Sequence, residues 1–314
     1  MLASLLYRLL HMTGVLLAVV TIVFAMLHMA GDPLDALTPP GSSPADVEAL
    51  RVKYGLDQPL ANQYLQFLAN AARGDFGTSW RFDEPARDVV MDRLPATLEL
   101  AGLAFGLALL IAVPLGVVAG ARSGGLAAWL YYGVSLFGQV LPAFWLGTIL
   151  ILVFSVQLDW FPSSGRTGEG STVLPVVTLA AYPASVLLRM VRASVQDAMS
   201  LDYVRTARAK GLPERAVMFG HVLKNAALPV IAYAGVLAGF LFAGAVVVEW
   251  VFAYPGIGQL ALQSVASRDL PVVLVFVTVT AFLIVIANLV ADLAAQFVDP
   301  QARQGELSVT GWSR

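Results

Sequence analysis

The chain has 314 residues, of which 58% are hydrophobic and 13% are charged, and its formal net charge is −2. A soluble domain carries roughly 25% charged residues, so the composition indicates an integral membrane protein, and the nearly neutral charge argues against nucleic acid as a partner. The sequence contains no cysteine, which excludes disulfides and thiolate metal sites.

Hydrophobic runs long enough to cross a bilayer, about 20 residues each, recur along the chain. They are predicted over residues 9–29, 96–120, 129–156, 172–191, 226–248 and 271–297. The first run could instead be a secretory signal peptide. The apolar core of such a peptide has roughly 7–15 residues, so a retained span is favoured. The expected fold class is an all-α integral membrane protein with about six transmembrane helices.

Residues 31–95 form a polar insert between the first two predicted spans. Ser43 and Pro44 suit the cap and first position of a helix, and residues 59–72 are typical of a second helix. We therefore expect a small helical domain outside the bilayer. The expected division of the chain is an N-terminus with the first span (1–30), the insert (31–95), a core with the remaining spans (96–298) and a tail (299–314).

Lysine and arginine in short loops indicate which side of the membrane each loop faces. The loops on the side of Arg8 carry most of these cations: Arg122, Arg205, Arg208, Lys210, Arg215, Lys224 and Arg303. The short loops on the opposite side carry Arg166 and Arg268. Both termini and the loop 194–225 are therefore expected in the cytoplasm, and the insert is expected outside.

The segment 202–229 is the most basic short stretch of the chain. Arg205, Arg208 and Lys210 stand where a helix C-terminus favours cations, and Gly211 can adopt the left-handed conformation that ends a helix. Pro213 suits the first position of a new helix, with Glu214 in its first turn. The pattern predicts two short helices that meet at a tight corner, which a charged loop alone would not require.

Polar residues inside spans mark candidate substrate pathways, and few are present. Ser135, Gln139 and Asn288 are best placed for neutral contacts across helices, so they are the candidate pathway residues. Glu99, Glu249 and Asp292 lie near span ends, where anchoring or capping is the simpler interpretation. Glycine and alanine are dense in the second, third and fifth spans. Such residues let helices approach closely, within this chain or at an interface with a second membrane subunit.

No pattern in the sequence predicts an active site. Ser79 stands in a Gly-x-Ser, but no strand is predicted before it and no histidine lies beside it in the insert. The three histidines are too scattered for a metal cluster. No lysine follows a glycine, so a phosphate-binding loop is absent. The chain is expected to be non-catalytic, with no metal or cofactor of its own, and any ATP-driven work would need an ATPase on another chain.

The segment Asp202-Tyr203-Val204-Arg205-Thr206-Ala207-Arg208-Ala209-Lys210-Gly211, closed by Leu228-Pro229, resembles the cytoplasmic loop of ABC importer permeases. In the broad family this loop begins Glu-Ala-Ala, with glycine four positions after the last alanine. Here Ala207 and Gly211 keep that spacing, and Arg205-Thr206 replace Glu-Ala, as in the peptide/nickel-type subfamily. Further similar stretches span nearly the whole chain, at 31–33, 54–60, 63–64, 73–77, 94–100, 249–258, 268–271, 292 and 299–300. The long insert is similar to that of the first of two permease subunits.

The resemblance implies how such a chain would work. An extracytoplasmic binding protein would deliver cargo, a homologous second permease would complete the path, and two cytoplasmic ABC ATPases holding ATP and Mg would bind the corner. The implied location is the bacterial inner membrane. The implied ATPase-coupling residues are Arg205, Thr206, Ala207, Lys210, Gly211, Leu212, Pro213 and Glu214. The implied external gate or binding-protein contacts are Glu249, Phe252, Pro255, Arg268 and Asp269.

Within this subfamily the expected cargo is a di- or oligopeptide. Nickel chelates, glutathione and other small solutes remain alternatives, because the sequence has no cargo signature. The absence of cysteine disfavours direct coordination of a metal ion. An ion-coupled secondary transporter is the alternative from another class. Such a protein would accumulate substrate without any ATPase.

Overall fold

The computed structural model describes residues 13–14, 17–26, 29, 34, 43–122 and 124–298. The predicted tail (299–314) and part of the predicted first span lie outside these residues, as do the side chain of Asp292 and the motif 299–300.

The described part of the chain is all-α, as predicted, with two π-helical segments and one isolated β-bridge, between Thr78 and Pro85. The elements are α3 (Pro44–Lys53), α4 (Leu60–Ala71), α5 (Ala86–Ala121), α6 (Gly125–Val140), α7 (Ala143–Leu150), η1 (Ile151–Gln157), α8 (Val173–Ser200), α9 (Asp202–Ala209), α10 (Glu214–Val217), η2 (Met218–Val222), α11 (Leu223–Val251), α12 (Ile257–Ala266) and α13 (Leu270–Val298).

Four helices in the described part of the chain are long and apolar enough to cross a bilayer. They match the second, fourth, fifth and sixth predicted spans, and a shorter apolar helix, Leu17–Met26, lies within the first. The helix of the second span begins ten residues before the predicted start, at Ala86. Its 36 residues extend about 54 Å at 1.5 Å per residue. A bilayer core is only about 30 Å thick, so part of α5 projects beyond it.

The third predicted span is not one straight helix. The chain bends by 111° between Gly125–Val140 and Ala143–Gln157, which is a broken span or a re-entrant loop. Leu141 is extended (φ −85°, ψ 120°) and Pro142 caps α7. Proline disfavours helical geometry in the residue before it, so Leu141-Pro142 accounts for the break that the uninterrupted apolar run concealed.

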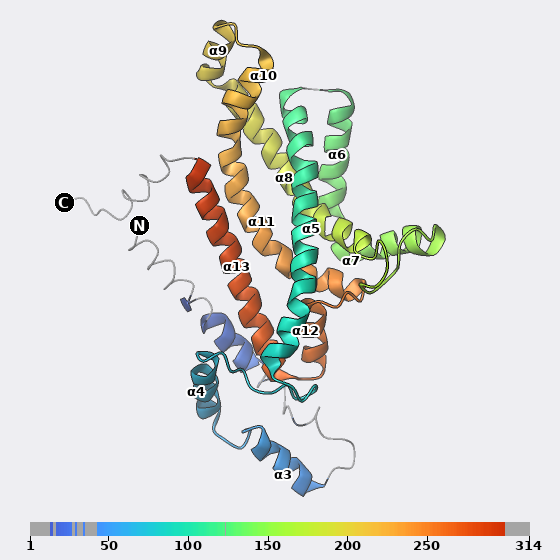
Figure 1. The fold of residues 1–314 in the computed structure, drawn as a ribbon, viewed down its shortest axis with the longest axis vertical. Coiled ribbons are helices and arrows are strands. Elements are labelled where there is room, and N and C mark those ends of the chain that lie inside the picture. The colour runs from blue at the N-terminus through green and yellow to red at the C-terminus, as the bar shows by residue number, and fades with distance from the viewer. Residues whose placement is uncertain are drawn as a thin grey trace, which may run out of the picture. The chain divides into compact units, whose positions relative to one another are not determined.

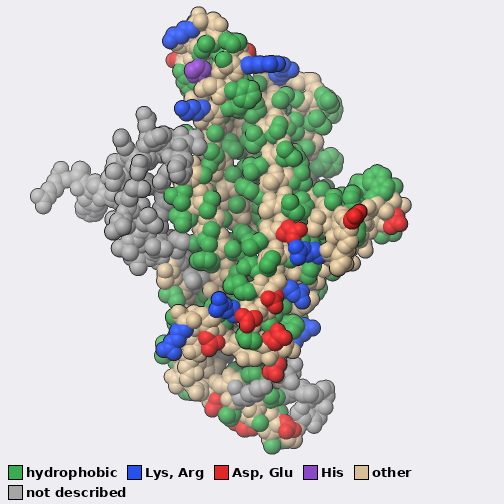
Figure 2. All heavy atoms as spheres, in the orientation of Figure 1, with side chains coloured by type: hydrophobic (Ala, Val, Ile, Leu, Met, Phe, Trp, Pro, Cys, Tyr) green, Lys and Arg blue, Asp and Glu red, His purple; other side chains and the backbone are tan. Residues whose placement is uncertain are grey.

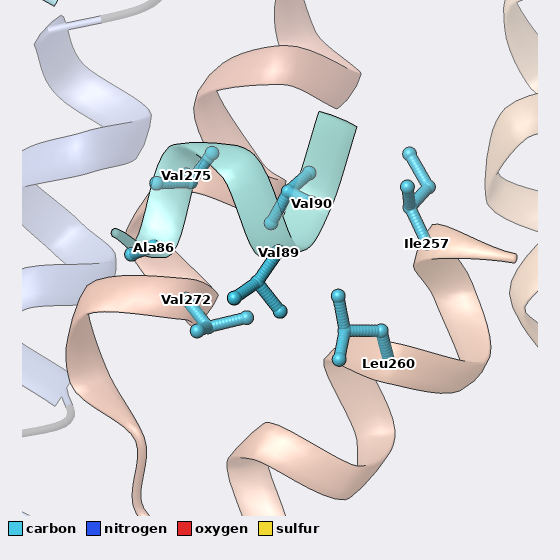
Figure 3. Packing of buried hydrophobic residues seen from close by; sticks show 7 residues of the cluster. All are labelled: Ala86, Val89, Val90, Ile257, Leu260, Val272 and Val275. Atoms are coloured by element: carbon cyan, nitrogen blue, oxygen red, sulfur yellow. The ribbon is translucent and has the colours of Figure 1, made fainter. Parts of the chain in front are cut away.

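The chain divides into two compact units, and α5 and α13 run from one into the other. The first unit comprises residues 1–98 and 253–283. In it α3 begins at Ser43, whose hydroxyl accepts a bond from the Asp46 amide at 3.2 Å, and α4 follows Pro59. Both helices of the predicted insert are therefore confirmed. Figure 3 shows the core of this unit, where α5, α12 and α13 bring together Ala86, Val89, Val90, Ile257, Leu260, Val272 and Val275.

The second unit comprises residues 99–252 and 284–314, and its long helices pack through glycine. A Cβ atom at Gly116 or Gly120 of α5 would come within 2.7 and 2.9 Å of Val191 and Val195 on α8. A Cβ atom at Gly235 of α11 would lie only 1.8 Å from the Ala291 Cβ on α13. These glycines therefore serve helix packing within the chain, as in membrane bundles generally.

Large hydrophobic side chains cover much of the outer surface of the second unit (Figure 2). Leu110 of α5, Trp129 of α6 and Phe240 of α11 are each more than half exposed. Extended apolar surface of this kind is normally covered by lipid or by a partner protein. The α9–α10 segment lies beyond the ends of α8 and α11 in the same unit (Figure 1).

Candidate functional site: a helical corner and a buried clamp

The predicted corner is present between α9 and α10. The Gly211 amide donates to the Arg208 carbonyl (2.9 Å), and the Leu212 amide donates to the Ala207 carbonyl (3.3 Å). Gly211 has φ +78°. This pair of bonds with a left-handed glycine is the Schellman ending of a helix. The residue at 211 must therefore tolerate a positive φ, which glycine does without steric cost.

An ion pair bridges the corner. The Arg208 Nε donates to Glu214 Oε2 at 3.1 Å, and its Nη2 donates to Oε1 at 2.6 Å. The hydrogen bonds from Arg208 lower the pKa of Glu214, and the same bonds raise the pKa of Arg208. Both side chains are largely solvent-exposed. The pair therefore contributes mainly a fixed geometry, because exposed ion pairs add little to stability.

The inner face of the corner is apolar, and its outer face is free of other described parts of the chain. Val204, Ala207, Val217 and Val222 are buried beneath it. Of the eight residues predicted for ATPase coupling, Ala207 is the buried one, and the others are exposed: Arg205, Thr206, Lys210, Gly211, Leu212, Pro213 and Glu214. A corner held from inside, with polar groups outside, presents a rigid and accessible surface.

The second helix of the corner is longer than predicted. α10 passes through the π-helical turn η2 into α11 without interruption, giving one helix from Glu214 to Val251. Pro213 caps this helix (φ −65°, ψ 145°) where we predicted its first helical residue. On the other side, only Leu201 separates α9 from α8. The corner is therefore joined directly to two membrane-length helices.

A buried carboxylate in the first unit links the insert that follows the first predicted span to the loop between α12 and α13. Asp269 is fully buried and accepts hydrogen bonds from the Ser79 hydroxyl (2.5 Å), the Trp80 amide (3.2 Å) and the Arg81 amide (3.3 Å). Nearby, the Ile257 amide that begins α12 donates to the Thr97 hydroxyl at 2.9 Å. Ser79 thus has a structural partner, and the Gly-x-Ser pattern marks a turn.

The five residues predicted as external gate or binding-protein contacts differ in exposure. Asp269 is buried as described, and Arg268 beside it is half-buried with φ +55°. Pro255 is half-buried, whereas Glu249 and Phe252 are buried in the second unit. There the Phe252 carbonyl accepts a bond from the Gly165 amide at 2.8 Å. Their role toward a partner stays a prediction.

The three predicted pathway residues lie in the second unit on α6 and α13. Gln139 and Asn288 are exposed, and Ser135 is half-buried with its hydroxyl oxygen enclosed. A cavity of about 540 Å³ lies among α5, α8, α11 and α13 of this unit, and its lining is apolar. None of the three residues lines this cavity, so their role in a substrate pathway also stays a prediction.

Sequence reasoning missed two arginines that feature in the structure. Arg208 was recognised as a helix-end cation but not as the partner of Glu214. Arg192 was placed just beyond the fourth span, but α8 continues to Ser200. The Arg192 guanidinium carbon lies 4.3 Å from the Tyr131 ring centroid and 5.9 Å from that of Tyr132. The sequence did contain a signal for the Arg208–Glu214 pair. It is an arginine followed six residues later by a glutamate, with a helix-ending glycine between them.

Within the described residues no group of three or more histidine, aspartate or glutamate side chains could hold a metal ion. The corner offers arginine, lysine and glutamate at the surface, without a nucleophile in contact with a base. Its chemistry is that of a binding surface. The clamp at Asp269 fixes the insert against α13. Both features therefore position parts of the chain relative to one another.

Two family models together cover almost the entire chain. Residues 112–304 match the family described as "binding-protein-dependent transport system inner membrane component", and residues 1–101 match its N-terminal companion. The oligopeptide transport system permease protein AppB of Bacillus subtilis (strain 168) is 39% identical over 316 residues, covering 96% of this chain and 99% of the relative. The glutathione transport system permease protein GsiC of Escherichia coli (strain K12) is 37% identical over 297 residues, covering 94% and 97%.

Two solved structures have a similar fold. One is titled as a crystal structure of an amino acid ABC transporter with histidines, with a TM-score of 0.54 and 16% identity over 67% of this chain and 94% of the other. The second is an inward-facing form of the MetNI methionine ABC transporter, with a TM-score of 0.54 and 18% identity over 67% and 96%. At these identities the likeness concerns the fold alone.

Proposed function

The chain belongs to the family of binding-protein-dependent transport system inner membrane components, a multi-pass permease subunit of an ABC importer, and we propose that it imports di- or oligopeptides. In this proposal an extracytoplasmic binding protein releases the cargo to the external side. A homologous second permease completes the pathway, and separate cytoplasmic ATPases supply the energy. ATP and Mg are held by those ATPases. The chain carries out no chemical reaction itself.

The observation that carries the proposal is the exposed corner joined directly to two long helices. Leu201 alone separates α9 from α8, and α10 continues into α11. A partner that grips the residues from Arg205 to Glu214 would therefore move both helices together. The Schellman ending at Gly211 and the Arg208–Glu214 pair would help the corner to keep its conformation when the partner moves it. We propose this corner as the ATPase-coupling site.

The external side would receive the cargo. The Asp269–Ser79 clamp holds the insert against α13, so a binding protein that rests on the insert would act on the last external loop too. We propose Glu249, Phe252, Pro255, Arg268 and Asp269 as the gate region, with the buried members as its framework. Ser135, Gln139 and Asn288 are proposed as pathway contacts. The apolar outer surface of the second unit supports burial against lipid and a second permease.

Glutathione is the second candidate cargo, because a relative of similar identity is named as a glutathione permease. Glutathione is itself a small peptide, so the same path would suit it. Neither relative reported above is named for nickel, so nickel chelates rank below the two peptide-type cargoes. The two peptide-type cargoes are separated by competition: unlabelled glutathione would block uptake of a labelled peptide only if it shares the site.

Uptake into proteoliposomes tests the transport class. The chain is reconstituted with its second permease and ATPases, and a labelled dipeptide is added with the binding protein. We expect accumulation with ATP on the ATPase side and none with an ion gradient alone. Accumulation driven by the gradient without ATPases would overturn the proposal. Mass spectrometry of the molecule retained by the binding protein identifies the cargo directly.

The orientation is testable because the chain lacks cysteine. Single cysteines at the exposed positions Ala209 and Asn62 need no other change. We propose that an impermeant maleimide labels Asn62→Cys on intact cells and Ala209→Cys only after permeabilisation. Labelling in the reverse pattern would contradict a cytoplasmic corner and an external insert.

A further inference from the structure

The first unit contains a pocket beside the Asp269 clamp, lined in part by Trp80. Its volume is about 360 Å³, within the range of small-molecule sites. It lies among the end of the Leu17–Met26 helix, the insert and the start of α13. Aromatic residues form a large part of its lining: Phe24, Tyr54, Phe67, Phe76 and Trp80.

The charged side chains among the described residues that line the pocket are carboxylates. Two carboxylates, Asp75 and Asp83, line the pocket together with the side chains of Gln63, Gln66 and Asn70. No lysine, arginine or histidine is among the described residues that line it. The neighbouring Arg81 instead lies over the ring of Phe82, 5.5 Å from its centroid, and neither residue lines the pocket.

The aromatic lining is held together by ring contacts. The centroids of Tyr54 and Trp80 lie 5.5 Å apart, and Phe67 stacks on Phe24 at 6.2 Å and meets Phe76 at 6.3 Å. Trp80 is also anchored through its amide to the buried Asp269 carboxylate. The rings therefore form a preorganised wall, which reduces the entropy lost when a ligand binds.

Both aspartates stand in turns of the backbone. Asp75 Oδ1 accepts a bond from the Gly77 amide at 2.9 Å, which makes a turn of the chain around that carboxylate. Asp83 has φ +55°, a conformation that aspartate and asparagine adopt more readily than most residues. Replacing either aspartate with asparagine would therefore remove charge with little change of shape.

We propose that this pocket binds an organic ammonium group. Aromatic rings attract a cation through their negative faces, and cages formed by aromatic side chains recognise ammonium ligands. The two carboxylates add Coulombic attraction, and the apolar side chains of Leu270, Pro271 and Leu274 suit the carbon substituents of the ligand. The ammonium group can belong to a soluble amine or to the ethanolamine headgroup of a phospholipid. Both sources share the same recognition chemistry.

Trp80 provides the readout. The full-length chain in maltoside micelles is titrated with choline while tryptophan emission is recorded, and 3,3-dimethylbutan-1-ol serves as the neutral analogue of the same shape. We expect a saturable change with choline and none with the alcohol at equal concentration. The change should disappear in Trp80→Phe. An equal response to the alcohol, or a response that persists in Trp80→Phe, overturns the proposal.

The carboxylates are tested by Asp75→Asn combined with Asp83→Asn. The combined loss of two partly exposed charges should weaken choline binding about tenfold, since each acts like a surface ion pair. Unchanged affinity in the double variant overturns the proposal. Leu60→Gln, an exposed change on α4 outside the pocket lining, is the control and should bind normally.

Lipid composition separates the two sources of the ammonium group. The choline titration is repeated in nanodiscs made of phosphatidylglycerol or of a mixture rich in phosphatidylethanolamine. A higher apparent Kd in the ethanolamine lipid supports a lipid headgroup as the occupant. The same Kd in both lipids supports a soluble ammonium compound. Absence of choline binding in micelles and in both nanodiscs overturns the proposal.

Discussion

The Arg208 guanidinium and the Glu214 carboxylate are joined by two hydrogen bonds, 3.1 and 2.6 Å long, across the turn at Gly211. The pair connects the last turn of α9 to the first turn of α10 and bridges the corner between them. Side chains this exposed stabilise the fold only slightly. We therefore expect the pair to affect the transmission of movement through the corner more than the free energy of unfolding.

Exchanging the two charges tests this role. Arg208→Glu and Glu214→Arg should each reduce cargo-stimulated ATPase activity of the assembled transporter, because each single variant places like charges across the corner. The double exchange should recover part of the activity. The single variants should melt close to the parent temperature. A double variant no better than either single one would show that the residues act separately, for example by direct contact with the ATPase.

Acidic pH should loosen the corner. Arg208 lowers the pKa of Glu214 in the folded chain, so the pair contributes stability above the ordinary glutamate pKa of about 4.3. That contribution is lost as the pH falls through the lowered, folded-state value. A spin label at Ala209→Cys should therefore gain mobility only at pH values below the ordinary glutamate pKa, and in Glu214→Gln the label should be mobile at neutral pH too. A mobility change centred near neutrality would contradict this assignment.

The buried Asp269 should be critical for the first unit. Asp269→Asn replaces an acceptor of three hydrogen bonds by an amide that can satisfy them only in part. We expect the free energy of unfolding to fall by about 2–4 kcal/mol, with faster proteolysis of the insert. Ser79→Ala removes one donor and should cost less. The measurement is limited proteolysis in micelles, with cleavage sites found by mass spectrometry; an insert as resistant as the parent's would disprove the clamp.

The glycine contacts give a matched pair of variants. Gly235→Ala would place a methyl group 1.8 Å from the Ala291 Cβ, and overpacking of this kind costs about 1–3 kcal/mol. Gly106→Ala on α5 meets nothing within 4 Å and should be neutral or stabilising by up to about 1 kcal/mol. Thermal melting in detergent compares them. Equal melting temperatures would contradict the close contact between α11 and α13.

The features that were predictable from sequence are local ones. The Ser43 cap, the ends of α4 and the stop at Gly211 follow from residues adjacent in the chain, because capping and turn conformations depend on near neighbours. The break at Leu141-Pro142 was also signalled locally, yet it was obscured by the apolar composition around it. The continuation of α10 into α11 was missed because the basic, polar start of that helix did not match a spanning run.

The contacts that were not predictable join distant segments. Ser79 and Asp269 are 190 residues apart, and no periodicity in a single sequence pairs them. The enclosure of Glu249 and Phe252 likewise depends on how helices pack. The pathway residues were selected for polarity alone, and polarity does not determine which face of a helix meets its neighbours. For the same reason, the aromatic pocket could not be derived from five rings scattered along the chain.

We propose that energy enters the chain through the corner at Gly211. Gly211→Val tests it most directly, because valine is strained at φ +78° while the space around the position is open. Gly211→Asn is the control, since asparagine tolerates that conformation. In proteoliposomes with the partner permease, ATPases and binding protein, the valine variant should lose cargo-stimulated ATPase activity and uptake while inserting normally, and the asparagine variant should retain both. Normal stimulated ATPase activity in Gly211→Val would contradict the account.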